Sequence, residues 1–130
     1  MDWEVAVKKV LAPIDRSKYK EKIIAYAISL GKAWGAEITA IHVIDLGRGV
    51  PGGRVKEKER EREEEAKREA EMLLVQLIDP LARKEGVNIR KEVVEESDSV
   101  AKSIIGYAKK KNMDVIVIGI TGMTAVEDFF

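Results

Sequence analysis

Cysteine is missing from this 130-residue sequence, and histidine occurs once, at His42. These absences exclude a disulfide framework, a thiolate metal site and, within one chain, a multi-histidine zinc or iron site. No apolar run approaches the length of a membrane span, and the opening Met-Asp-Trp-Glu is not a signal peptide. We therefore expect a cytoplasmic protein with no membrane partner.

Net charge is also missing, because 23 basic residues balance 23 acidic ones. A broad nucleic-acid-binding surface would make the chain net basic, so we expect no nucleic-acid partner. Charged residues still make up 35% of the chain, while Asn and Gln are few, a composition that resembles a thermophile's surface. The length predicts a single domain over residues 1–130, large enough to bury its own core.

The stretch Asp114–Gly122 organises the rest of the chain. Val115–Ile118 is a run of four β-branched apolar residues, which fits a strand buried on both faces of a parallel sheet. Gly119 and Gly122 follow it. Glycine permits positive φ and close approach of a ligand to the backbone, so the pair predicts a ligand loop, with an ordinary turn as the alternative.

Three further strands are expected, at residues 5–14, 37–44 and 87–94. The first ends in Pro13-Ile14-Asp15, which would share a sheet edge with the glycines. Helical spacing of apolar residues predicts a helix after each strand. We expect Ser17 to cap the first helix, and Ser97 or Asp98 to cap the third.

A glycine-rich segment, residues 46–55, formally satisfies the dinucleotide pattern G-x-G-x-x-G at Gly47, Gly49 and Gly52. Pro51 interrupts the pattern, and no apolar helical face begins before Ala66. We therefore interpret the segment as a connector. The Lys56–Glu71 stretch that follows holds 14 charged residues in 16 and predicts a solvated helix extension, with a partner-binding arm as the alternative.

The element order β-α-β-α-β-α-β predicts an α/β fold, a doubly wound parallel sheet with helices on both faces. Two strand orders remain open, the flavodoxin-like 2-1-3-4-5 and the related 3-2-1-4-5. In either order, ligands bind outside the carboxyl ends of the strands at the switch point.

Four segments together resemble the universal stress protein family. They are Lys9–Ser17, which is similar to its opening strand and loop, Ala40–Asp45, Ser97–Ile104, and Asp114–Gly122, which is similar to the first half of its ATP motif. The resemblance spans nearly the whole chain. It implies a Rossmann-like, adenine-nucleotide alpha hydrolase-like three-layer sandwich with strand order 3-2-1-4, the family's usual fifth strand being missing.

The resemblance also implies a nucleotide site. Val43 would lie against adenine, Asp15 would face the phosphates or their Mg²⁺, and the other residues would line the nucleoside, ribose and phosphate path. The implied set is Pro13, Ile14, Asp15, Val43, Ile118, Gly119 and Gly122. An apolar wall for the base, backbone amides for the anion and one carboxylate for a hard cation make a coherent site.

Two positions depart from the family pattern. Arg16 stands where glycine is usual, and its side chain either reaches a phosphate or projects into solvent. The second glycine-hydroxyl pair of the ATP motif would fall just beyond Phe130, so the chain resembles a C-terminally short member. Those residues normally open the helix that receives the phosphates.

The leading hypothesis is an adenine-nucleotide-binding regulatory protein of the stress response. The alternative is a dimeric interaction module that binds no nucleotide. Slow ATP hydrolysis ranks below both, because no placed base and lysine accompany Asp15. We interpret His42 as a hydrogen-bonded core or rim residue. Without a fifth strand, Val115–Ile118 would form an open apolar edge, so we also expect a homodimer that buries this edge or residues 121–130.

Overall fold

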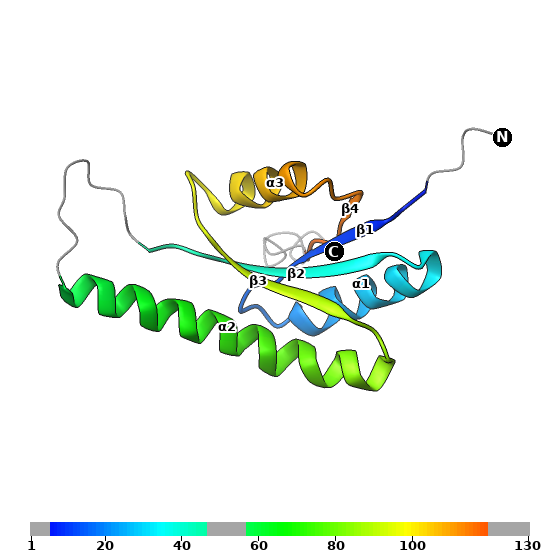
Figure 1. The fold of residues 1–130 in the computed structure, drawn as a ribbon, viewed down its shortest axis with the longest axis horizontal. Helices are drawn as coiled ribbons and strands as arrows, with labels where there is room; N and C mark the ends of the chain where they lie inside the picture. Colours follow the sequence, from blue (N-terminus) through cyan, green and yellow to red (C-terminus); the bar gives the residue numbers. More distant parts are fainter. Residues whose placement is uncertain (1–5, 47–56, 120–130) are drawn as a thin grey trace, which may run out of the picture.

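The computed structural model describes residues 6–46 and 57–119. Within these ranges four strands alternate with three helices (Figure 1). The elements are β1 (Lys9–Pro13), α1 (Lys20–Trp34), β2 (Glu37–Ile44), α2 (Glu57–Glu85), β3 (Ile89–Glu95), α3 (Val100–Lys110) and β4 (Val115–Ile116).

The four strands form one parallel sheet in the order β3-β2-β1-β4. This order confirms the predicted 3-2-1-4 arrangement. β1 and β2 pair over five residues, from Lys9 opposite Glu37 to Pro13 opposite Ile41. The carboxyl ends of all the strands therefore meet at one edge.

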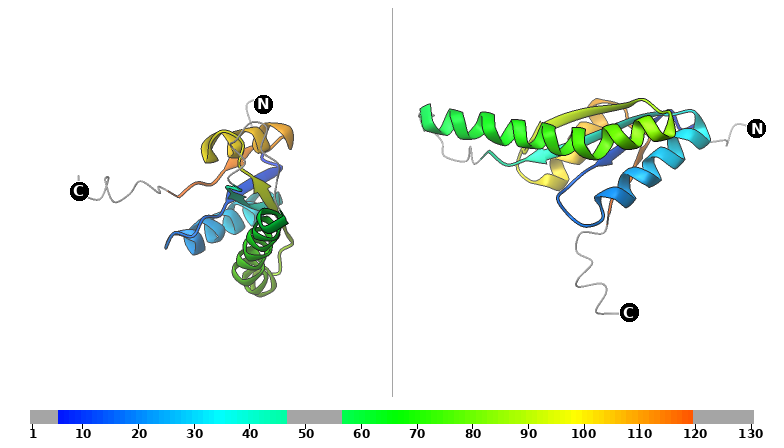
Figure 2. Two further views of the ribbon diagram at one scale, coloured as in Figure 1. Left: turned by 90° about the vertical axis from the view of Figure 1, so that its left-hand side faces the viewer. Right: turned by 90° about the horizontal axis from the view of Figure 1, so that it is seen from below.

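The central strand β1 is covered on both faces. Val10 and Ala12 pack into the larger core cluster beneath α1 and α2, whereas Leu11 packs with Ile41 and Tyr107 beneath α3. Two helices thus lie on one face of the sheet and one on the other (Figure 2). Alternation of apolar side chains along a strand with two buried faces produces this arrangement.

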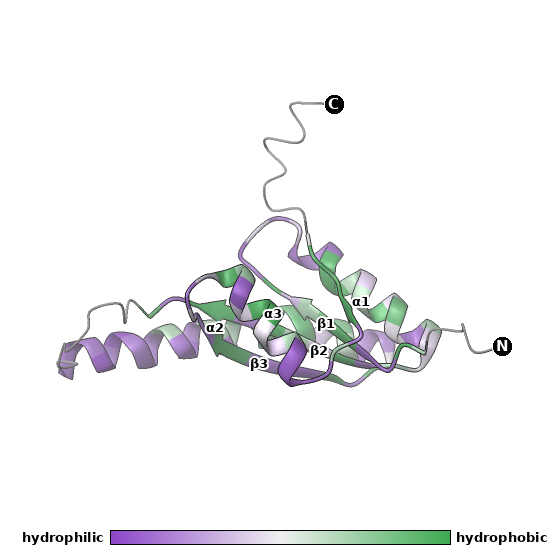
Figure 3. Ribbon diagram, turned by 90° about the horizontal axis from the view of Figure 1, so that it is seen from above, coloured by the Kyte–Doolittle hydropathy of each residue, from purple (hydrophilic) through white to green (hydrophobic). Residues whose placement is uncertain are grey.

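The fully buried residues of the long helix α2 begin near its middle and are Ala70, Leu74 and Ile78. Its first turns are charged and extend past the sheet (Figure 3), in agreement with the predicted solvated extension. The helix ends before Gly86, whose φ of 65° is in the left-handed region that glycine adopts without strain.

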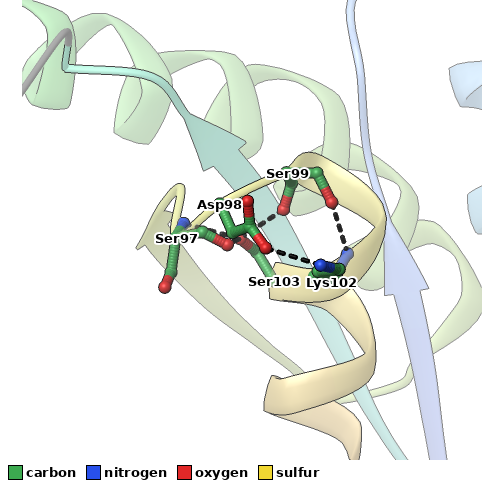
Figure 4. Close-up of polar contacts among 5 residues, drawn as sticks. All are labelled: Ser97, Asp98, Ser99, Lys102 and Ser103. Atoms are coloured by element: carbon green, nitrogen blue, oxygen red, sulfur yellow. Dashed lines mark hydrogen bonds and ion pairs between the residues drawn. The ribbon is translucent and has the colours of Figure 1, made fainter. Parts of the chain in front are cut away.

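Helix α3 begins in a closed network of short polar side chains (Figure 4). Ser99 is its N-cap, with Oγ accepting from the Lys102 N–H at 3.1 Å, so the predicted caps at Ser97 and Asp98 were wrong. Ser97 instead donates its N–H to the Ser103 Oγ at 2.8 Å, and the Asp98 carboxylate pairs with the Lys102 ammonium at 2.6 Å. Ser99 has the extended conformation that a cap requires, whereas Asp98 has a φ of 72°.

A second contact ties α3 to the edge strand β3. The Tyr107 hydroxyl donates to Oε2 of Glu92 at 2.5 Å. Burial of the ring, together with this hydrogen bond to a carboxylate, raises the pKa of Tyr107 to about 12. The phenol therefore stays protonated at neutral pH and keeps donating.

Strand β4 differs from the expected buried strand. Only Val115 and Ile116 pair with β1, at Val10 and Leu11, and both are half-buried at the edge of the sheet. Val115 and Val117 pack against the core beneath α1 and α2, and Ile116 packs against the cluster beneath α3, so the run is covered in part on both faces. Ile118 is 65% exposed, and for this residue the predicted burial was wrong. The apolar run in the sequence does not indicate how far the neighbouring helices extend over these residues.

No helix in the described part of the chain is long and apolar enough to cross a membrane.

Asp114 fastens the beginning of β4 to the beginning of β1. Its Oδ2 accepts from the backbone N–H groups of Lys8 and Lys9, each at 2.9 Å, and its own N–H donates to the Lys9 carbonyl at 2.9 Å. The hydrogen bonds from Lys8 and Lys9 hold the pKa of Asp114 below its usual value. The ionised carboxylate therefore stabilises the register of the two strands.

We predict that Asp114→Asn lowers the free energy of unfolding at pH 7, because the charge that strengthens both hydrogen bonds is removed. A depressed folded-state pKa gives stability that is present above the unfolded pKa and lost as pH falls through the folded one. The difference between wild type and variant should therefore shrink as pH falls through the folded pKa. Urea unfolding at neutral and acidic pH measures it, and a difference independent of pH would contradict the assignment.

Candidate functional site

The predicted site residues lie at the carboxyl edge of the sheet. Pro13 is the last residue of β1, and Val43 lies on β2 two residues beyond its partner Ile41. The Val117 N–H donates to the Leu11 carbonyl at 2.9 Å. The residues after β4 therefore lie beside the end of β1. The structure thus brings the ends of β1 and β4 together, with Val43 on the next strand.

These residues divide between the two faces of the sheet. Val43 packs with the cluster beneath α3, and so does Ile116, so by alternation Ile118 belongs to the same face. Ile14 is only 3% exposed and packs into the core beneath α1 and α2. Its side chain therefore lies in the core, and only its backbone reaches the edge of the sheet.

Asp15 and Ser17 shape the loop after β1. Oδ1 of Asp15 accepts from the Ser17 N–H at 2.8 Å, and the Ser17 Oγ accepts from the Tyr19 N–H at 3.2 Å. Such side-chain to backbone bonds hold a turn in place of a helix. The predicted cap at Ser17 was wrong, because α1 begins after Tyr19 and has no side-chain cap there.

His42 also contacts this loop, through its backbone at Ile14. Its Nδ1 lies 2.6 Å from the Ile14 carbonyl oxygen, and the side chain is buried. Because a carbonyl only accepts, Nδ1 carries the proton and donates. Ile14 in turn donates its N–H to the Ile41 carbonyl at 2.7 Å. The prediction of a hydrogen-bonded core or rim residue is confirmed.

Arg16 turns toward α2. Its Nη2 lies 4.0 Å from Oε2 of Glu69, and both side chains are largely exposed. An exposed pair at this distance contributes little stability. Of the two alternatives for Arg16, this position agrees with projection into solvent.

Gly119 is required for a reason that differs from the expected one. Its φ lies outside the left-handed region, but an added Cβ would meet Cδ1 of Ile23 at 2.8 Å and Cγ1 at 3.3 Å. The glycine lets the segment after β4 lie against the start of α1. Sequence reasoning had no signal for this contact, because Ile23 is distant in the chain. Gly122 is outside the described residues.

The donor groups at this edge are sparse. Among residues 6–46 and 57–119, no group of three His, Asp or Glu side chains is placed to hold a metal ion. Asp15 offers one carboxylate, of which one oxygen already accepts from Ser17. A divalent cation fits here only as an ion that brings most of its own ligands, such as Mg²⁺ on a phosphate chain.

We predict that Gly119→Ala destabilises the fold by about 1–3 kcal/mol, because the methyl group must displace Ile23. Ile23→Val removes the Cδ1 that the methyl group meets. The cost of Gly119→Ala should therefore be smaller in the Ile23→Val background than in wild type. A double-mutant cycle by chemical denaturation measures the coupling, and strictly additive effects would contradict the contact.

Comparison with known proteins agrees with this fold. The sequence model of the universal stress protein family matches residues 6–130. The chain is 32% identical over 120 residues to a universal stress protein of Methanocaldococcus jannaschii, covering 92% of this chain and 68% of the relative.

Solved structures of the family share the architecture. A universal stress protein of Lactobacillus plantarum superposes with a TM-score of 0.73 at 22% identity, covering 91% of this chain and 80% of that one. An Archaeoglobus fulgidus member in complex with dAMP gives 0.55 at 21% identity, covering 95% and 90%. A third member, in complex with cAMP, gives 0.59 at 16% identity, covering 92% and 80%. At these identities the structures establish the shared fold.

The match to the family model over almost the whole chain, the curated relative and the 3-2-1-4 parallel sheet lead to one conclusion: this chain belongs to the universal stress protein family.

Proposed function

We propose that this protein binds an adenine nucleotide as a regulatory ligand in a stress response. The observation that carries the proposal is the convergence of Pro13, Val43 and Ile118 at the carboxyl edge of a parallel sheet. Ligands of open α/β sheets bind at this edge. Two family members were solved with dAMP and with cAMP, which supports an adenine nucleotide as the ligand class.

Each residue has a role in this proposal. Val43 contacts the adenine, Pro13 and the backbone of Ile14 border the nucleoside, and Asp15 faces the phosphates. The remaining members, Ile118, Gly119 and Gly122, border the ribose and phosphate path. Mg²⁺ enters with the phosphate chain of ATP, and Asp15 supplies one oxygen to it. None of these residues is assigned to catalysis.

The hydrogen bond of His42 holds one part of the proposed site in place. By donating to the Ile14 carbonyl, the imidazole holds the Pro13–Asp15 turn before any ligand binds. A preformed turn lowers the ordering cost of binding. The same hydrogen bond occupies the Nδ1 proton, and this supports a structural role for His42 over one as general base.

We predict weak binding of ATP, ADP and AMP, with ATP little better than AMP, because Asp15 offers a phosphate-bound cation one carboxylate, of which one oxygen already accepts from the Ser17 N–H. Asp15→Asn should remove the Mg²⁺-dependent part of ATP affinity, about fivefold, or ~1 kcal/mol for a partly exposed carboxylate. Asparagine can still accept from Ser17, so the turn is kept. Isothermal titration calorimetry with and without Mg²⁺ measures the difference.

Asp98→Asn is the matched control, because Asp98 lies in the loop before α3 and its φ of 72° suits asparagine. It should leave the affinity unchanged. No heat with any of the three nucleotides at near-millimolar concentration would favour the second candidate function, a dimeric interaction module without a nucleotide.

The open edge of β4 supports self-association as part of either function. In the described part of the chain β4 pairs on one side only, with β1. We predict a dimer at micromolar concentration, in which β4 or the residues after it lie against a second copy. Light scattering after size exclusion gives the mass. A monomer with fast amide exchange at Val115–Val117 would contradict this prediction.

A further inference from the structure

The opposite edge of the sheet, strand β3, has the features of a contact between two copies. Its neighbour in the described sheet is β2 alone. The Glu96 N–H donates to the Ile44 carbonyl at 2.7 Å. This hydrogen bond shows which residues of β3 direct their backbone groups toward β2. Even-numbered residues turn their backbone groups toward β2, and odd-numbered residues turn theirs outward. Lys91 and Val93 therefore present backbone donors and acceptors at the outer edge.

The charges along this edge change sign from one end of the strand to the other. The segment reads Arg-Lys-Glu-Val-Val-Glu-Glu from Arg90 to Glu96, basic at the start and acidic at the end. An antiparallel copy centred on Val93 places Lys91 opposite Glu95 and Arg90 opposite Glu96, and a two-fold axis repeats each pair. Lys91 already pairs with Asp79 of its own chain, so the attraction between the two copies depends mainly on Arg90 and Glu96. Opposite charges facing across strands stabilise a pairing, and like charges oppose it.

The direction of the backbone groups along β3 is compatible with an antiparallel pairing centred on Val93. Val93 and Lys91 are outward residues, and so they form the hydrogen-bonded pairs of an antiparallel ladder centred on Val93. Arg90 and Glu96 then form non-hydrogen-bonded pairs, in which side chains approach most closely. Arg90 is exposed, so its guanidinium is accessible to a second chain.

Charge on an edge strand often prevents pairing. In β3 the order of the charges discriminates between partners. A parallel copy in register would set Arg90 and Lys91 against themselves. An antiparallel copy sets them against acidic residues, so the segment repels one arrangement and attracts the other.

The surroundings of β3 leave room for a second copy. A groove of about 560 Å³ lies between α2 and β3, lined in part by Ile44, Leu74, Val75 and Val93. Another of about 780 Å³ lies between α3 and β3 on the other face. Val75 is 45% exposed on the flank of α2 beside this edge, and Met72 is 59% exposed on the same helix. A copy seated on β3 would bring a second α2 toward this apolar flank.

We propose that β3 pairs with β3 of a second copy, antiparallel and centred on Val93. Four strands from each copy then form one continuous sheet. This contact lies at the opposite edge of the sheet from β4. It uses none of the residues proposed for the nucleotide site, although Val43 of that site is the register partner of Val94 on β3.

Charge-reversal variants test the register. Arg90→Glu and Glu96→Arg should each weaken dimerisation about tenfold, because each substitution places like charges opposite one another twice per dimer. An equimolar mixture of the two variants should recover the wild-type affinity, since the substituted positions then face one another with opposite charges. Light scattering at low ionic strength, where exposed pairs are least screened, gives the masses. If the mixture behaves like the separate variants, or if wild type is a monomer, the proposal is overturned.

A single cysteine tests the contact directly, because the natural sequence has none. Val93→Cys places two thiols across the axis with Cα atoms about 5.5 Å apart, within the range of a disulfide. Ile118→Cys at the β4 edge is the matched control. Oxidation should give a covalent dimer for Val93→Cys, and this result supports the β3 contact whether or not the control also forms one. A dimer for Ile118→Cys alone overturns the β3 contact and leaves the β4 contact and nucleotide binding standing.

Discussion

Strand β1 must be covered on both faces, and the remaining structure is arranged around that requirement. Its residues Val10, Leu11 and Ala12 have no exposed surface, with α1 and α2 on one side and α3 on the other. A central parallel strand that loses either cover exposes apolar side chains to water. The crossovers through α1, α2 and α3 therefore place helices on both faces, and this fixes where the strand ends emerge.

The helices cover the two faces of the sheet unequally, and the candidate site lies where the cover is incomplete. Two helices close one face, so Ile14 and Ile23 are buried there, whereas α3 alone lies on the other. Beyond the reach of α3, Ile118 is exposed next to the end of β1. Two hydrogen bonds hold the Pro13–Asp15 turn, from His42 to the Ile14 carbonyl and from the Ser17 N–H to the Asp15 carboxylate. A fixed polar turn beside an open apolar strand end is an arrangement that suits a flat base with a polar tail.

Much of this arrangement could be predicted from the sequence, because it follows from local patterns. Alternating apolar residues identified the strands, and the βα alternation implied a parallel sheet. His42 was correctly interpreted because one polar side chain in an apolar strand must find a partner. The cap of α3 was missed because Ser97, Asp98 and Ser99 are all suitable residue types, and backbone geometry decides between them. The predicted cap at Ser17 was wrong because Ser17 bonds within the turn before α1, which begins after Tyr19 without a side-chain cap. Gly119 and Ile118 were misjudged because their surroundings come from distant segments, Ile23 in one case and the extent of α3 in the other.

The two edges of the sheet are governed by different physics. β4 is short and apolar in its described part, so any partner there is selected by burial and by backbone pairing, which discriminate poorly between registers. β3 is basic at its start and acidic at its end, so electrostatics favour an antiparallel copy over a parallel one. A contact at β3 would leave the carboxyl ends of β1 and β4 free, because β2 separates β3 from β1. Assembly through β3 and ligand binding therefore use different residues, although Val43 of the proposed site is the register partner of Val94 on β3.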